Sequence, residues 1–202
     1  MLKAGLTGGM GSGKSAAGEI FRSLGCPTLD LDLVSRQVTR PGQPALDAIS
    51  DVFGPGILQA DGTLNRSKLA EVAFTDIESR ICLEQILHPL IMEAAGEWIQ
   101  AMEGRPDPPP VVMLEIPLLF EVGLEHTVDR IVLITASVET RVQRIVVRRG
   151  ISETEARARM ASQQSDDSKR SRSHYIIDNN GSLENLRQSV GEVWKKLAAE
   201  AG

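Results

Sequence analysis

The sequence is poor in aromatic residues and in cysteine. Only 3% of its 202 residues are aromatic, which excludes the stacking platform that proteins use to bind single-stranded nucleic acid. Two cysteines, Cys26 and Cys82, are too few for a disulfide framework or a metal cluster, and we expect both to be reduced and buried. No apolar run approaches the ~20 residues that a membrane-spanning helix needs.

Other absences concern location and partners. The net charge of −5 argues against a general nucleic-acid or membrane-surface role. An apolar strand begins almost at Met1, so we expect no signal peptide. The guanine-recognition pattern Asn-Lys-x-Asp of GTPase switches does not occur. We therefore expect a cytoplasmic protein without nucleic-acid or membrane partners, as a monomer or a small homo-oligomer.

The chain begins with a phosphate-binding pattern. Residues 8–15 read Gly-Gly-Met-Gly-Ser-Gly-Lys-Ser and fit G-x-x-x-x-G-K-S/T, the P-loop of nucleoside triphosphate enzymes. Glycines let backbone N–H groups turn inward around a phosphate, and the helix that follows points its N-terminus at the same anion. Lys14 can then reach the β- and γ-phosphates of ATP, and the Ser15 hydroxyl can ligate Mg²⁺.

The elements around the P-loop predict its architecture. Short apolar runs predict strands at 2–7, 26–31, 111–116, 130–135 and 175–178. The runs at 111–116 and 130–135 lack alternation, as expected for parallel strands that are covered on both faces. Helical patterns occur at 16–24, where Ile20, Phe21 and Leu24 share a face, and at 45–53, 66–74, 77–102, 140–149, 153–164 and 183–199. We expect Pro89 to interrupt or kink its helix.

Alternating strands and helices predict an α/β fold with a five-stranded parallel sheet flanked by helices. We expect a P-loop core of residues 1–33, 111–140 and 173–202. Residues 34–110 do not alternate, and they predict a helical acceptor-binding region. Residues 141–172 predict a lid. The active site is expected at the carboxyl ends of the strands.

Carboxylates are expected at the same edge of the sheet. If the second strand ends at Asp32, then Asp30 and Asp32 share one face and Leu31 points to the other. One carboxylate could accept a proton from an attacking hydroxyl while the other orients water or Mg²⁺; a helix N-cap or turn is the alternative. Glu115 ends the third strand, where it either holds a magnesium-bound water or caps the turn.

Basic residues dominate the predicted lid. Arg141, Arg144 and Arg148 recur at helical spacing, so they share one helix face. They are either part of a lid that closes over the transferring phosphates or a solvated face. His88 either caps its helix break or touches a substrate. Asn180 lies either in an adenine-binding loop or in a plain turn.

Several segments together resemble one family, bacterial dephospho-coenzyme A kinase. They run in order through nearly the whole chain: residues 6–15, 29–32, 41–46, 61–66, 87–91, 116–121 and 177–181, with Arg144, Arg148 and Gln163. The resemblance implies Mg·ATP-dependent phosphorylation of the ribose 3′-hydroxyl of dephospho-coenzyme A, on a P-loop nucleoside-kinase-like core with a helical acceptor domain and a lid. Another small-molecule or nucleoside monophosphate kinase, or a P-loop regulatory switch, is the alternative.

The resemblance also implies roles by position. Asp32 is similar to the catalytic base, Lys14 acts at the phosphates, and Arg144 and Arg148 are similar to lid arginines. The implied ATP-binding residues are Gly9, Met10, Gly11, Ser12, Gly13, Lys14, Ser15, Ala16 and Asn180. The expected acceptor-binding residues are Asp30, Asp32, Arg36 and His88. The chain departs from the family at Leu31, where alanine is usual, and at Ser173 and His174, where Ala-Asp is common.

Overall fold

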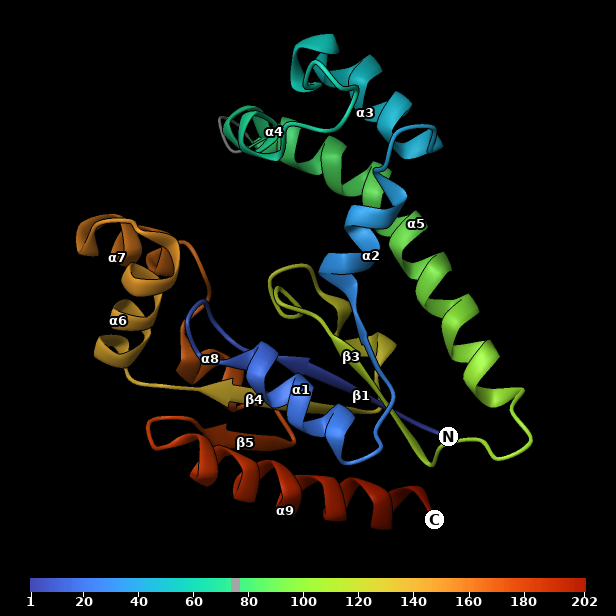
Figure 1. Ribbon diagram of the computed structural model, residues 1–202, viewed down its shortest axis with the longest axis vertical. Helices are drawn as coiled ribbons and strands as arrows, with labels where there is room; N and C mark the ends of the chain where they lie inside the picture. The colour runs from blue at the N-terminus through green and yellow to red at the C-terminus, as the bar shows by residue number, and fades with distance from the viewer. Residues whose placement is uncertain (74–76) are drawn as a thin grey trace. The chain divides into compact units, whose positions relative to one another are not determined.

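The computed structural model describes residues 1–73 and 77–202. A five-stranded sheet forms its core, with all neighbouring strands parallel and in the order β2-β3-β1-β4-β5 (Figure 1). The strands are β1 (Leu2–Thr7), β2 (Thr28–Asp30), β3 (Val111–Glu115), β4 (Arg130–Thr135) and β5 (Tyr175–Asp178). The predicted α/β fold with a five-stranded parallel sheet is therefore confirmed.

Both faces of the sheet are covered, as its continuous apolar strands require. On one face, helices α1 (Lys14–Ser23) and α9 (Leu183–Ala201) pack on alternate strand residues such as Met113 and Val132 (Figure 1). The intervening residues Val112, Leu114 and Leu133 are buried on the other face. The short helix α8 (Asp166–Arg170) contacts β4.

Four helices near the carboxyl end of the chain begin in the same way. The N-cap residues of α6 (Val138–Arg149), α7 (Glu153–Ala161), α8 and α9 are all serines, and each hydroxyl accepts a hydrogen bond from the N–H three residues on. Such caps satisfy N–H groups that a helix leaves unpaired. A 3₁₀ turn, η2 (Leu124–Thr127), lies between β3 and β4.

The chain divides into two compact units. Unit 1 comprises residues 1–30 and 103–202 and holds the sheet, whereas unit 2 comprises residues 31–102 and is helical. Its elements are α2 (Leu31–Val38), α3 (Pro44–Phe53), η1 (Pro55–Ile57), α4 (Arg66–Ala73) and α5 (Ile77–Glu103). Leu46, Ile49, Ile57, Leu64 and Leu69 form its core. No helix in the described residues is long and apolar enough to cross a membrane.

The second strand ends earlier than predicted. β2 stops at Asp30, and Leu31 begins helix α2, so the expectation that Asp30 and Asp32 share one face of a strand is wrong. Leu31 and Val34 are buried on one side of α2, which is the helical pattern that the Asp-Leu-Asp alternation obscured. Asp32 lies in the first helical turn, where the helix dipole favours a negative charge.

Other details differ from the predictions. Leu24 caps α1 and is 40% exposed, so it does not share the buried face of Ile20 and Phe21. α5 runs without interruption through Pro89. Cys82 is exposed, although Cys26 is buried as expected. The predicted end of the helix at Phe74 lies outside the described residues.

Candidate active site

The P-loop follows β1, the central strand, and therefore lies at the carboxyl edge of the sheet. Gly11 and Gly13 have φ angles of +79° and +96°, a left-handed conformation that suits glycine. A Cβ atom on Gly8 would lie 2.6 Å from the Ser12 Oγ, and one on Gly13 would overlap the Asn179 side-chain amide. The glycine pattern is thus required by the fold of the loop itself.

The loop presents unsatisfied donors. In the described part of the chain, the backbone N–H groups of Gly11, Gly13, Lys14 and Ser15 have no hydrogen-bond partner. They gather at the N-terminus of α1, where the helix dipole also favours an anion. The Ser12 Oγ is buried and likewise lacks a partner. This cradle fits the phosphates of a nucleotide, which the P-loop sequence predicted.

Glu115, at the end of β3, connects the P-loop lysine to the sheet. Its Oε2 lies 3.2 Å from the Lys14 Nζ and its Oε1 lies 2.6 Å from a guanidinium nitrogen of Arg22, while the carboxylate is 1% exposed. Strand register places Asp30 beside Glu115 on β2. Lys14, Gly18 and Arg22 are four residues apart on α1, so they share the helix face that meets this carboxylate.

Burial raises the pKa of Glu115, and the nearby Lys14 and Arg22 charges oppose that rise. The ion pair with Glu115 holds the Lys14 ammonium beside the end of β3. Both Glu115 oxygens contact cations, so its expected role toward a magnesium-bound water stays a prediction. Among the described residues, no cluster of three or more His, Cys, Asp or Glu side chains could hold a metal by itself.

The three α6 arginines of the predicted lid face differ in their surroundings. Arg141 is 6% exposed, and its guanidinium bonds to the Met10 carbonyl at 2.9 Å and to Asp166. This burial rules out a solvated helix face for Arg141, whereas its place in a lid stays a prediction. Arg144 donates to the Asn179 carbonyl at 2.9 Å and to the Ser12 carbonyl at 3.4 Å, so it already touches the P-loop.

Arg148 is exposed, and its side chain has no hydrogen bond or ion pair with another described residue. It is thus more open to a ligand than Arg141 or Arg144. The candidate adenine loop is a tight turn in which the Asn180 backbone and side-chain amide both donate to the Asp178 carboxylate. The Asn180 Oδ1 accepts from the Ser137 N–H at 2.8 Å and so connects this turn to the start of α6.

Unit 2 contains the remaining predicted site residues. Asp32 and Arg36 are exposed and lie four residues apart on α2. Both are near enough to Arg66 to affect it electrostatically: burial and then the Arg36 charge lower the pKa of Arg66, and Asp32 opposes them. The Arg66 guanidinium also donates to the Thr39 hydroxyl at 2.6 Å. His88 is half-buried inside α5.

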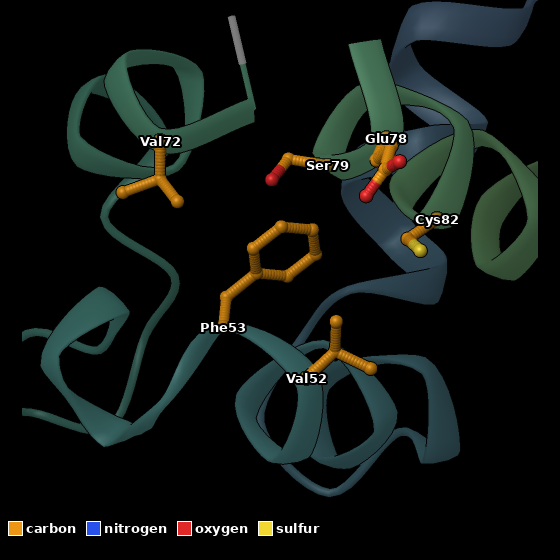
Figure 2. Close-up of a pocket in the computed structure, with 6 residues that line it drawn as sticks. All are labelled: Val52, Phe53, Val72, Glu78, Ser79 and Cys82. Atoms are coloured by element: carbon orange, nitrogen blue, oxygen red, sulfur yellow. The ribbon is translucent and has the colours of Figure 1, made fainter. Parts of the chain in front are cut away.

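A cavity of about 420 Å³ also lies in unit 2. The Phe53 ring points into it, between the residues of α4 and α5 that complete the lining (Figure 2). Its walls are formed by Val52, Phe53, Val72, Glu78, Ser79 and Cys82. None of the predicted site residues lines this cavity.

Sequence reasoning did not predict several contacts that shape the P-loop and its lysine. The sequence does contain a pattern for Gly18 and Arg22. Their spacing from Lys14 places all three on the helix face that meets Glu115. Asn179 donates to the Ser12 carbonyl at 2.7 Å, and Gln163 accepts from the Met10 N–H at 2.8 Å. The family resemblance includes Gln163 and the segment 177–181, but no local pattern predicts that they contact the P-loop, since each lies more than 150 residues from its partner.

The sheet order, the P-loop on the central strand and the anion cradle define a P-loop kinase. Among solved structures, shikimate kinase from Acinetobacter baumannii shares this fold with a TM-score of 0.56 at 15% identity. The sequence model of the family described as dephospho-CoA kinase matches residues 2–185. The chain belongs to this family, whose enzymes catalyse the last step of coenzyme A synthesis.

Individual relatives agree. The dephospho-CoA kinase of Syntrophotalea carbinolica is 41% identical over 98% of this chain and 92% of its own length. That of Mycobacterium tuberculosis is 43% identical over 96% of this chain, which spans only 47% of the longer mycobacterial protein. The match to a solved structure of dephospho-CoA kinase from Campylobacter jejuni covers 98% of both chains, with a TM-score of 0.70 and 26% identity.

Proposed function

We propose that this protein transfers the γ-phosphoryl group of ATP to the ribose 3′-hydroxyl of dephospho-coenzyme A, giving coenzyme A and ADP. The observation that carries the proposal is the set of unpartnered N–H groups of the P-loop beside a lysine aligned by Glu115. Those donors suit the phosphates of the donor nucleotide, and membership of the family supplies the acceptor. We place the reaction in the cytoplasm, with the protein as a monomer or a small homo-oligomer.

The donor half of the site is assigned to unit 1. The loop from Gly9 to Ala16 binds the phosphates, chiefly through the N–H groups of Gly11, Gly13, Lys14 and Ser15. Lys14 neutralises charge on the transferring group, which lowers the barrier because charge is redistributed over its oxygens. The exposed Ser15 hydroxyl fits a Mg²⁺ ion bound together with ATP, which would neutralise the phosphate charge.

The lid and adenine assignments rest on α6 and the turn after β5. Arg148 is exposed and Arg144 reaches the P-loop backbone, so both can meet phosphate oxygens. Asn180 connects the turn after β5 to the start of α6 and is assigned to the adenine side. These roles predict that nucleotide binding tightens this part of unit 1.

The acceptor half is assigned mainly to unit 2. Asp32 is exposed in the first turn of α2, where its carboxylate can take the proton from the attacking hydroxyl. Arg36 lies one turn further on and offers a positive charge for the acceptor's phosphates. Asp30 lies at the sheet edge beside Glu115 and orients magnesium-bound water. His88 completes the set as a half-buried polar contact on α5.

A direct assay tests the proposal. ADP formation from Mg·ATP is followed with dephospho-coenzyme A and, in parallel, with nucleoside monophosphates, which the alternative kinase function would use. We expect turnover with dephospho-coenzyme A only. Lys14→Ala should lower that turnover by orders of magnitude while circular dichroism stays unchanged. Preferential use of a nucleoside monophosphate, or near-normal turnover by folded Lys14→Ala, would contradict the proposal.

A further inference from the structure

The peptide groups on both sides of Met10, at the tip of the P-loop, are bonded to a distant part of unit 1. The Met10 N–H donates to the Gln163 Oε1 at 2.8 Å, and the Arg141 Nε donates to the Met10 carbonyl at 2.9 Å. The Met10 side chain packs on an apolar cluster of α6 and α7 that includes Val142 and Ala156. The backbone of the tip is therefore held by residues that are far from it in the sequence.

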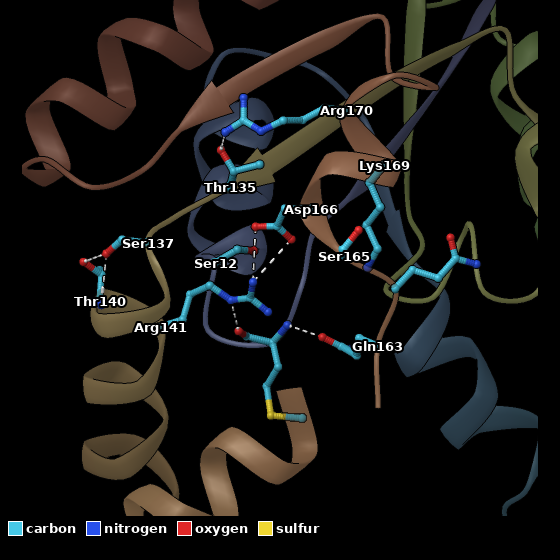
Figure 3. A network of polar contacts seen from close by, with 12 residues as sticks. Ser12, Thr135, Ser137, Thr140, Arg141, Gln163, Ser165, Asp166, Lys169 and Arg170 are labelled. Atoms are coloured by element: carbon cyan, nitrogen blue, oxygen red, sulfur yellow. Dashed lines mark hydrogen bonds and ion pairs between the residues drawn. The ribbon is translucent and has the colours of Figure 1, made fainter. Parts of the chain in front are cut away.

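Arg141 fits against the loop only because the loop has glycines there. A Cβ atom on Gly9 would lie 2.8 Å from the Arg141 Cζ, and one on Gly11 would lie 2.7 Å from the Arg141 carbonyl oxygen. The Arg141 guanidinium also lies 3.2 Å from the Asp166 carboxylate (Figure 3). Asp166 lies three residues after Gln163. The Met10 N–H is thus bonded directly to this segment, and the Met10 carbonyl is connected to it through Arg141.

That segment, residues 163–169, is anchored on its other side. The Gln164 N–H donates to the Glu121 Oε1 at 3.2 Å, and the Gln164 side-chain amide donates to the Phe120 carbonyl at 3.2 Å. The Lys169 Nζ lies 2.7 Å from the same Glu121 oxygen, and Lys169 is fully buried. A buried charge is costly to leave unpaired, so this ion pair fixes the segment against the loop after β3.

We propose that Gln163 is a positioning residue for the nucleotide, which holds the tip of the P-loop in its phosphate-binding shape through the Met10 N–H. The inference rests on the proposed use of ATP. With the Met10 N–H taken by Gln163, the tip cannot rotate toward solvent, and the N–H groups of Gly11 and Gly13 stay available for a phosphate. A donor set that is fixed before binding loses less freedom when ATP binds.

Two substitutions separate positioning from simple packing. Gln163→Met keeps the length of the side chain but removes the acceptor oxygen. We expect a 10- to 100-fold weaker affinity for a non-hydrolysable ATP analogue with Mg²⁺, a similar loss of kcat/KM for ATP, and an unchanged KM for the acceptor. Gln163→Glu keeps an acceptor oxygen for the Met10 N–H but adds a negative charge near the phosphates. Its loss of affinity should shrink as salt is raised, whereas that of Gln163→Met should not.

Gln143→Met is the matched control, because Gln143 is exposed on α6 and has no hydrogen bond to the described residues of the P-loop or of the anchored segment. It should bind the analogue as the unmodified protein does. Wild-type affinity in Gln163→Met would overturn the inference, and so would a Gln163→Glu variant that stays equally defective at high salt. If Gln163→Met does not fold, the salt dependence of the affinity of Gln163→Glu still tests the inference. Because the analogue is bound without acceptor, a wrong acceptor assignment would leave this result unchanged.

Discussion

The close approach of Gly18 to Glu115 makes a glycine inside helix α1 testable. Replacing a helical glycine by alanine ordinarily stabilises a helix by roughly 0.5–1 kcal/mol. At Gly18 the new Cβ would lie 2.6 Å from the Glu115 Cδ and still closer to Oε1, well inside van der Waals contact. Either Glu115 or α1 must move, and the carboxylate then leaves its positions beside Lys14 and Arg22.

The steric and electrostatic losses outweigh the helix gain. Overpacking a core position costs typically about 1–3 kcal/mol, and breaking a fully buried ion pair about 3–5 kcal/mol. The second figure must be reduced, because Arg22 is 40% exposed and its charge is partly screened. We therefore expect Gly18→Ala to lower the free energy of unfolding by about 2 kcal/mol, in spite of its better helix propensity.

The measurement uses the two tryptophans. Trp98 lies in unit 2 and Trp194 in unit 1, so a Trp98→Phe background makes urea unfolding followed by fluorescence report on unit 1. Gly191→Ala in α9 is the matched control, because nothing lies within 4 Å of its new Cβ, and it should be slightly stabilising. If Gly18→Ala raises the unfolding midpoint as the control does, Glu115 does not pack against α1 and the reasoning is refuted.

Three further predictions concern the reaction and its pH dependence. Asp32→Asn should lower kcat by roughly two to four decades with little change in substrate binding, and Asp30→Asn should be milder; steady-state kinetics with the reverse order would exchange their roles. Mg·ATP should slow amide hydrogen exchange across residues 141–172, and protection confined to the P-loop would contradict a lid around Arg144. Folding raises the pKa of Glu115 above its ordinary value of about 4.5. The stabilisation that this raised pKa gives the folded state is therefore complete at low pH, and it is lost as the pH rises from about 4.5 through the higher pKa of the folded state. In urea unfolding over this pH range, the free energy of unfolding of Glu115→Gln should therefore increase relative to that of the unmodified protein. If the difference between the two free energies stays constant with pH, the pKa of Glu115 is not raised.

The sheet and the P-loop could be predicted because their signals are local. Short apolar runs identify the five strands, of which β1, β3 and β4 are largely buried, and the spacing from Gly8 to Ser15 identifies the phosphate loop. The start of α2 was missed for a local reason too. Asp30, Leu31 and Asp32 alternate as in a strand, and the helical spacing of Leu31, Val34 and Val38 appears only when the window is extended.

The partners of the P-loop could not be predicted, because they are brought together only by the folded sheet. Lys14 and Glu115 are 101 residues apart in the chain, and Met10 and Gln163 are 153 apart. Their meeting depends on strand order, which no short window contains. The same holds for Arg141, whose helical spacing with Arg144 predicted a shared face but whose burial depends on the shape of the P-loop.

Glycine is therefore needed in the P-loop for a second physical reason, besides the binding of phosphate. Gly9 and Gly11 leave room for Arg141, and Gly13 leaves room for Asn179. An alanine at any of these positions would displace a neighbour of the loop even with no nucleotide present. A substitution there would thus disturb the loop before it disturbed phosphate binding, so weaker ATP binding by itself cannot assign a contact to the glycine. Removing the neighbour instead, as in Gln163→Met, tests the shape of the loop while its own residues stay unchanged.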